Sequence, residues 1–263
     1  MKQGRRKEVT HMTYEEILVW WKKQKIETKE DIYTILDNFK VLFSYHSGKV
    51  ENDNITLHDT REIFENGNVI NYTGDLRTLF EIKNQKDCFE HLVDKIVSKE
   101  EITLEFIKEL HLELMKGCYD ETRFKKEERP GEFKKHDYVT GDGVGTSPED
   151  VEWELQELLS EINDAEGKDV LTIAVYLHLR FEEIHPFADG NGRVGRTLMN
   201  YYLMTHGFPP VVLHSEEKKT YYLALSVYDK TGEISGFKEF VKEQMVKTWQ
   251  KKKKPSVKLS MFL

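Results

Sequence analysis

Residues 184–196 read Ile-His-Pro-Phe-Ala-Asp-Gly-Asn-Gly-Arg-Val-Gly-Arg, and they place an imidazole, a carboxylate, a Gly-Asn-Gly turn and two guanidinium groups within a dozen residues. The Gly190-Asn191-Gly192 segment allows positive φ angles, so its backbone N–H groups can turn to one side and form a concave nest for an anion. The residues that follow, 193–205, carry apolar side chains at helical spacing. We therefore expect the nest at a helix N-terminus, where unpaired N–H groups and the macrodipole favour phosphate.

Charged and titratable side chains surround this predicted phosphate site. Arg193 and Arg196 are three residues apart on the first helical turn, so we expect both guanidinium groups to face one polyanion. His185 precedes the turn, in the position of a proton acceptor, and Asp189 offers a hard oxygen ligand to a Mg²⁺ ion that keeps most of its waters. Each feature alone is commonly structural, since Gly-Asn-Gly is often only a turn. Their combination predicts a nucleotide-phosphate site with its own base.

The same residues resemble the HPFx[DE]GNGRxxR signature of the Fic/Doc family, and residues 185–196 match every fixed position. The resemblance implies a mainly helical protein that transfers AMP from ATP, with Mg²⁺ or Mn²⁺, to a protein hydroxyl group. It implies that His185 is the general base, Asp189 the metal ligand and Phe187 a buried anchor of the loop. The related Doc branch, which phosphorylates its target, has Lys where this chain has Gly192. The residues implied to bind the nucleotide phosphates are Gly190, Asn191, Gly192, Arg193 and Arg196.

A second motif, formed by Ser47, Glu51 and Asn52, resembles the inhibitory motif [ST]xxxE[GN] of Fic proteins. The resemblance implies that the Glu51 carboxylate pairs with Arg196 and occupies the guanidinium that should hold the ATP γ-phosphate. ATP would then bind with its α-phosphorus misplaced, and an error of about 1 Å can cost roughly a hundredfold in rate. The alternative is a helix C-terminus with an incidental acid. In some relatives the same Glu helps to remove AMP, so the direction of the reaction stays open.

Two further segments resemble parts of the family's site. Residues 133–146 resemble a hairpin flap that receives the target backbone as an added strand, and the alternative is a solvent-exposed loop. Tyr221 and Tyr222 match a pair that lines the nucleotide pocket in some relatives, although aromatic pairs are as often core residues. Those relatives have Asn at the position of Asp229, so a base other than adenine is open. The flap residues expected to dock the target are Tyr138, Val139 and Thr140.

The composition is that of an ordinary globular protein, with 38% hydrophobic and 33% charged residues. Abundant helix formers and only six Pro favour an all-α class, with one short β-hairpin near residues 133–146. The net charge of −8 argues against nucleic acid as a partner. There is no apolar run of about 18 residues to span a membrane, and the basic N-terminus is not followed by the apolar segment of a secretory leader. A cytoplasmic location is therefore the expectation.

Three regions are expected along the chain. Residues 1–56 are predicted to form a helical extension that carries the inhibitory motif, residues 57–250 the Fic catalytic domain, and residues 251–263 a basic flexible tail. Within the extension one helix is expected from Thr28 toward Ser47. The polar segment 119–146 is predicted to contain no helix, and Ser147 followed by Pro148 predicts a helix start. Other helices are expected to begin at 13 and to span 57–64, 75–98, 104–115, 168–184, 193–205, 216–228 and 235–249.

Three functions remain open on the sequence. The first is an autoinhibited protein adenylyltransferase, whose partners would be the Ser, Thr or Tyr hydroxyl of a target protein or of the chain itself, with a homo-oligomer as a further possibility. The second is an enzyme that removes AMP or transfers another nucleotide group. The third is a nucleotide-responsive binding module. The intact His185, Asp189 and Arg196 argue against the third, because a binding module needs neither a base nor a metal ligand.

Overall fold

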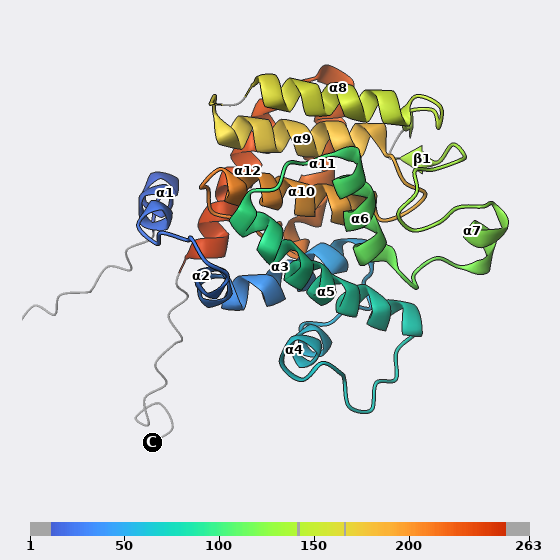
Figure 1. Ribbon diagram of the computed structural model, residues 1–263, viewed down its shortest axis with the longest axis horizontal. Helices are drawn as coiled ribbons and strands as arrows, with labels where there is room; N and C mark the ends of the chain where they lie inside the picture. The colour runs from blue at the N-terminus through green and yellow to red at the C-terminus, as the bar shows by residue number, and fades with distance from the viewer. Residues whose placement is uncertain (1–11, 141–142, 166, 251–263) are drawn as a thin grey trace, which may run out of the picture.

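The computed structural model describes residues 12–140, 143–165 and 167–250, which fold almost entirely into α-helices (Figure 1). The described residues form twelve α-helices and one two-stranded sheet, so the predicted all-α class with a short hairpin is confirmed. The predicted basic tail lies outside the described residues, as do residues 1–11 and residues 141–142 within the predicted hairpin.

The N-terminal part of the described chain contains four helices: α1 (Tyr14–Lys22), α2 (Lys29–Ile35), α3 (Asp37–Glu51) and α4 (Leu57–Asn66). The single helix expected from Thr28 toward Ser47 is wrong, because the chain bends between α2 and α3. The bend lies at Leu36, whose φ of −94° and ψ of 9° leave the helical region and whose side chain is only 1% exposed. The motif from Ser47 to Glu51 lies in the last part of the second of these helices, α3, which ends at Glu51.

The middle of the chain contains α5 (Leu76–Ser98), α6 (Leu104–Met115), α7 (Glu121–Lys125), β1 (Val139–Thr140) and β2 (Gly143–Val144). The prediction of no helix over 119–146 is wrong at α7, which is five residues long. Its cap explains it, because the Asp120 side chain accepts a hydrogen bond from the Arg123 N–H. β1 and β2 are antiparallel, with Val139 opposite Val144.

The C-terminal part contains α8 (Val151–Asp164), α9 (Val170–Ile184), α10 (Asn191–Thr205), a 3₁₀ turn (Ser215–Glu217), α11 (Lys218–Thr231) and α12 (Ser235–Trp249). The predicted helix start at Ser147 is wrong, since α8 begins at Val151. The Ser147 hydroxyl instead donates to the Asp150 carboxylate at 2.7 Å, within a turn that contains Pro148. The Ser147 side chain therefore closes a turn before the helix and does not cap α8.

α10 lies at the centre of the molecule, and thirteen of its fifteen residues are buried. It packs against α9 on one side, with α8 covering α9, and against α3, α5 and α6 elsewhere (Figure 1). This central position places the first turn of α10 where segments far apart in the sequence can reach it. No helix among the described residues is both long enough and apolar enough to cross a membrane.

Candidate active site

The turn between α9 and α10 is held by buried contacts. His185 ends α9 with φ 52° and ψ 61°, a left-handed conformation that residues other than Gly rarely adopt. The buried ring of Phe187 stacks on His111, with ring centroids 3.7 Å apart. Asn191 accepts a hydrogen bond from the Phe187 N–H at 2.9 Å and donates one to the Phe187 carbonyl at 2.8 Å. The loop is therefore fixed at both ends by groups that water does not reach.

Replacing Asn191 with alanine is expected to lower the free energy of unfolding by about 2 kcal/mol, because the buried N–H and carbonyl of Phe187 both lose their partner. Urea unfolding followed by circular dichroism measures the change. Asn163→Ala is the matched control, since it removes only an exposed hydrogen bond to Glu101 and should cost less than about 0.5 kcal/mol. Equal losses for the two variants would contradict the anchoring role.

The Gly190-Asn191-Gly192 segment forms the beginning of α10. Gly190 is the N-cap, with φ 86° and ψ 4°, and no side chain accepts a hydrogen bond from the N–H groups of the first turn. The expected positive φ at Gly192 is wrong, because Gly192 is already helical. A side chain there would instead collide with the Glu51 carboxylate and lie 2.8 Å from Arg196 Nη1. The unpaired N–H groups suit an anion, and Gly192 leaves room beside them.

Arg196 is 1% exposed, and its guanidinium donates to α3. Nη2 lies 2.8 Å from Glu51 Oε1 and 2.9 Å from the Ser47 carbonyl, and Nε lies 3.1 Å from Ser47 Oγ. The predicted pairing of Glu51 with Arg196 is thus present in the structure. Burial alone would lower the pKa of Arg196, but Glu51 raises it above its ordinary value, so the guanidinium stays charged. Asn52 does not share in this contact and points to α5.

Arg193 has different partners from Arg196. Its Nη1 lies 3.1 Å from Glu81 Oε1 on α5, and its Nη2 lies 3.4 Å from Asp189 Oδ1. The expectation that both guanidinium groups face one polyanion does not hold for this structure, because their side-chain contacts are with different carboxylates. The two side chains start on one helical turn, but each extends to the carboxylate supplied by the helix it faces.

Three guanidinium groups converge on the Asp189 carboxylate. Arg77 Nη2 of α5 lies 2.8 Å from Oδ2, Arg123 Nη2 of α7 lies 3.1 Å from the same oxygen, and Arg193 approaches Oδ1. Burial alone would raise the pKa of Asp189, but these charges hold it below its usual value. The sequence analysis missed Arg77 and Arg123, since nothing in their local sequence links them to a residue so far along the chain.

Asp189 offers a divalent metal only one carboxylate. Among the residues that the structure describes, no three His, Cys, Asp or Glu side chains are grouped to hold an ion. Both oxygens of Asp189 contact guanidinium groups, so a cation alone would meet positive charge there. A Mg²⁺ ion accepts one or two carboxylates when substrate phosphates and waters complete its octahedron. The residues therefore fit a metal that arrives with a nucleotide.

His185 is the histidine that lines the cavity at this site. Burial lowers the pKa of His185 to about 4, and the positive charge of Lys134 is the second cause of this lowering. The ring is therefore neutral at pH 7. Lys134 is 2% exposed, and its Nζ has no hydrogen-bond partner among the described residues. Burial also raises the pKa of Glu182 to about 8, which keeps that carboxyl protonated. Glu182, which lines the cavity, was not predicted from the sequence.

A cavity of about 1020 Å³ opens over the loop. Arg193, Arg196, Ser47 and Asn52 are not among the residues that line it. Of the two predicted aromatic residues, Tyr221 is 2% exposed and bonded to His178, whereas Tyr222 is 42% exposed. Predicted site residues that line the cavity are Glu51, Tyr138, Val139, His185, Asp189, residues 190–192, Tyr221 and Tyr222.

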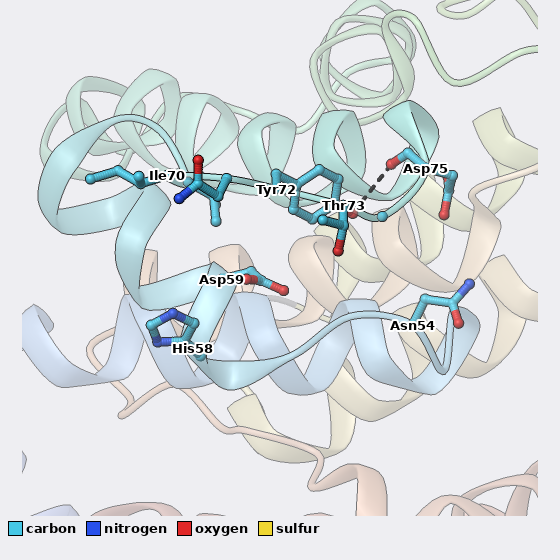
Figure 2. A pocket seen from close by; sticks show the side chains of 10 residues that line it. Asn54, His58, Asp59, Ile70, Tyr72, Thr73 and Asp75 are labelled. Carbon is cyan, nitrogen blue, oxygen red and sulfur yellow. Dashed lines mark hydrogen bonds between the residues drawn. The ribbon is translucent and has the colours of Figure 1, made fainter.

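A second cavity, of about 550 Å³, lies between α4 and the segment that leads into α5 (Figure 2). Its carboxylates are engaged in helix caps. Asp59 accepts a hydrogen bond from the Thr56 hydroxyl at 2.7 Å, and Asp75 accepts one from the Thr78 hydroxyl at 2.6 Å. This cavity contains none of residues 184–196, whereas His185, Asp189 and the start of α10 line the first cavity, which is the candidate active site.

Comparison with known proteins agrees with this geometry. The chain is similar to the protein adenylyltransferase Fic of Drosophila persimilis, with 31% identity over 206 residues that cover 78% of this chain and 39% of the relative. The corresponding protein of Drosophila virilis is 30% identical over 206 residues, 78% of this chain and 41% of the relative. The chain thus spans about two fifths of the length of the curated relatives it matches.

Two solved structures share the fold. A Fic-domain-containing signalling protein from Bacteroides thetaiotaomicron is 25% identical, with a TM-score of 0.76 over 89% of this chain and 93% of the other. Fic-1 of C. elegans (residues 134–508) is 26% identical, with a TM-score of 0.71 over 89% of this chain and 70% of the other. Residues 101–203, which include the loop between α9 and α10, match the Fic/DOC family. Over this segment the chain is similar to proteins of the Fic/DOC family.

Proposed function

We propose that this chain is an autoinhibited protein adenylyltransferase, which transfers AMP from ATP to a hydroxyl group of a target protein or of itself. The observation that carries the proposal is one cavity in which the neutral imidazole of His185, the unpaired N–H groups at the start of α10 and the Asp189 carboxylate meet. The relatives named protein adenylyltransferase Fic support AMP as the transferred group.

His185 is proposed to act as the general base. Its neutral ring takes the proton from a Ser, Thr or Tyr hydroxyl as that oxygen forms a bond to the α-phosphorus of ATP. The bond from the α-phosphorus to the bridging oxygen of the β-phosphate breaks, and pyrophosphate leaves with that electron pair. The left-handed backbone at His185 and the anchored Phe187 fix the ring beside the first turn of α10.

The start of α10 is proposed to hold the phosphates. N–H groups of residues 190–192 and the guanidinium groups of Arg193 and Arg196 would stabilise the charge that develops on pyrophosphate. Asp189 would hold a Mg²⁺ or Mn²⁺ ion that enters with ATP, and such an ion neutralises charge on phosphate oxygens. The N–H groups already lie at the cavity, whereas the two guanidinium groups would exchange contacts with Glu81 and Glu51 for the phosphates.

The contact between Glu51 and Arg196 is proposed to be the inhibitory element. Glu51 is 31% exposed on its side chain whereas Arg196 is buried, so the carboxylate reaches inward from the cavity wall. A terminal phosphate would need the same Nη2 donor, and it would meet the negative charge of Glu51. Ser47 supplies two more acceptors to the guanidinium and holds it toward α3. ATP bound beside this closed contact would have its α-phosphorus out of line.

The hairpin is proposed to receive the target backbone. Val139 is 81% exposed and Val144 59% exposed at the cavity mouth, and the two strands pair only with each other in the described chain. Such short strands offer unpaired N–H and carbonyl groups to an extended segment. The hydroxyl of Tyr138 donates to Glu128 Oε1 at 3.0 Å and so anchors the base of the hairpin. Thr140, which ends β1, is proposed to contribute backbone groups.

ATP labelled at either the α- or the γ-phosphorus tests the proposal. We expect covalent α-label and no covalent γ-label on the Glu51→Gly variant after incubation with Mg²⁺ or Mn²⁺. Covalent γ-label would indicate phosphorylation instead, and loss of AMP from previously modified protein, without incorporation, would indicate removal. Nucleotide binding with neither label on the protein would identify a binding module. Parallel incubations with labelled GTP and CTP test whether a chain with Asp at position 229 uses a nucleotide other than ATP.

The pH dependence of transfer should report the environment of His185. Because its pKa is lowered to about 4, the base is unprotonated from neutral pH downward and is lost only as the pH falls through about 4. We expect kcat/KM for Glu51→Gly to stay level between pH 8 and about 5, with circular dichroism verifying the fold at each pH. A decline centred near the ordinary histidine value of 6.5 would contradict this environment.

Lys134 gives the pH profile a matched pair of variants. Since its charge adds to the lowering of the His185 pKa, Lys134→Met should move the acid limb of kcat/KM to higher pH. Lys135→Met, at the exposed neighbouring position, should leave the limb in place. If the acid limb of kcat/KM does not move in Lys134→Met, burial alone lowers the pKa of His185.

A further inference from the structure

Glu81 is a buried carboxylate outside both sequence motifs. It lies on α5 and is 3% exposed. Oε1 lies 3.1 Å from Arg77 Nε and 3.1 Å from Arg193 Nη1, while Oε2 accepts a hydrogen bond from Asn52 Nδ2 at 2.7 Å. A carboxylate so enclosed is tolerated only when donors of this kind compensate for lost hydration. Glu81 therefore connects the last residue of the inhibitory motif with two guanidinium groups.

The same two guanidinium groups also bind Asp189. Arg77 reaches Glu81 through Nε and Asp189 through Nη2, at 3.1 and 2.8 Å. Arg193 reaches Glu81 through Nη1 at 3.1 Å and Asp189 through Nη2 at 3.4 Å, which is long for a charge-assisted hydrogen bond. Two carboxylates thus share two guanidinium groups, and Arg193 lies closer to Glu81.

This sharing has a consequence for a cation at Asp189. If Glu81 lost its charge, the buried Arg193 would keep only Asp189 as a carboxylate partner and would bind it more tightly. An incoming cation would then have to displace a stronger competitor. The loss of a negative charge next to the site would weaken cation binding further. Both effects would weaken the binding of a cation at Asp189.

We propose that Glu81 is a positioning residue, which draws Arg77 and Arg193 partly away from Asp189 and so keeps that carboxylate accessible to the metal of a metal–nucleotide complex. The inference rests on the proposed function, because it concerns the metal that ATP would bring. Asn52 holds Oε2 and fixes the orientation of Glu81. The inhibitory motif thereby contacts both halves of the site: Glu51 acts on Arg196, and Asn52 acts through Glu81.

Binding of Mn²⁺ tests the proposal without turnover. Electron paramagnetic resonance of free Mn²⁺ gives its half-saturation concentration in the presence of a saturating non-hydrolysable ATP analogue. All variants carry Glu51→Gly, so that Arg196 is equally available. Glu81→Gln keeps the shape and removes the charge, and it should raise the half-saturation concentration roughly tenfold, which corresponds to about 1.4 kcal/mol. Glu90→Gln on the same helix is the control, since Glu90 pairs only at 3.8 Å with Lys86.

A second variant is expected to lower the half-saturation concentration of Mn²⁺, and it does not change a buried residue. The side chain of Arg77 is 40% exposed, and Arg77→Met removes one competitor from Asp189, so the half-saturation concentration should fall. In steady state, Glu81→Gln should raise the apparent KM for Mn–ATP and leave kcat at saturating metal within about twofold. Asn52→Ala should act like Glu81→Gln but more weakly, and the two changes together should be less than additive.

Unchanged half-saturation in Glu81→Gln, or a rise in Arg77→Met, would overturn the role of Glu81. If Glu81→Gln does not fold, the sign of the Arg77→Met change decides alone. Failure of the proposed function is distinguished by a separate measurement, because the Glu51→Gly protein would then take no covalent α-label from ATP, whatever its half-saturation concentration for Mn²⁺.

Discussion

Replacing His185 with alanine in the Glu51→Gly protein is expected to lower AMP incorporation by about 10²–10⁴-fold, the usual contribution of a general base. The nucleotide should still bind, because the phosphate donors are backbone groups and guanidinium groups elsewhere in the loop and α10. That loop is held by Phe187 and Asn191, whose contacts the substitution does not touch. Initial rates with α-labelled ATP measure the transfer, and isothermal titration with the non-hydrolysable analogue measures binding.

His136→Ala is the matched control for this prediction. His136 is an exposed imidazole at the base of the hairpin, and its ring bonds only to the Lys126 carbonyl, at 3.1 Å, among its side-chain contacts. Its removal should leave the rate within about twofold. A His185→Ala protein that retained more than a tenth of the rate would exclude the base, and one that lost nucleotide binding would make the residue structural.

Glu51→Gly is expected to raise the initial rate of transfer by roughly a hundredfold over the wild-type chain, which is what correcting a misplacement of about 1 Å can achieve. The substitution removes the carboxylate 2.8 Å from Arg196 Nη2 and opens the space that Gly192 leaves beside it. Arg196 keeps its two contacts with Ser47, so the guanidinium stays oriented while one donor becomes free. Glu51→Gln, which keeps an acceptor but loses the charge, should give an intermediate rate.

A glycine near the end of α3 also weakens the helix, and this effect needs its own control. Lys49→Gly places the same residue in the last turn of α3 without touching Arg196. It should leave the rate near that of the wild type. Equal activation by Lys49→Gly and Glu51→Gly would show that loosening of α3, and not loss of the carboxylate, releases the enzyme.

Local sequence patterns were sufficient for much of this molecule. Helical spacing of apolar residues and capping residues such as Thr13 and Thr28 predicted most helices of the described chain. The motif containing Glu51 led to an ion pair with Arg196 that the structure contains across 145 residues of sequence. The helices could be predicted from consecutive residues, and the ion pair from a known pairing of two sequence motifs.

The remaining features depend on contacts between distant segments. The apolar pattern of residues 32–43 continues through Leu36, so it does not reveal that the helix is interrupted there, with φ −94° and ψ 9°. Arg77, Arg123 and Glu81 belong to the site only because α5 and α7 pack beside the loop. A single charged residue on a helix carries no sign of which carboxylate it will meet. These residues are the ones for which a structure was necessary.

The central claim is that the first turn of α10 holds a triphosphate in line with His185 once Glu51 is removed. A crystal structure of the Glu51→Gly protein with the non-hydrolysable ATP analogue and Mg²⁺ tests it most directly. We predict the phosphates on the N–H groups of residues 190–192, the terminal phosphate at Arg196, and the imidazole facing the α-phosphorus opposite the bridging oxygen of the β-phosphate. Phosphates bound elsewhere, or an imidazole turned away from the α-phosphorus, would contradict the account.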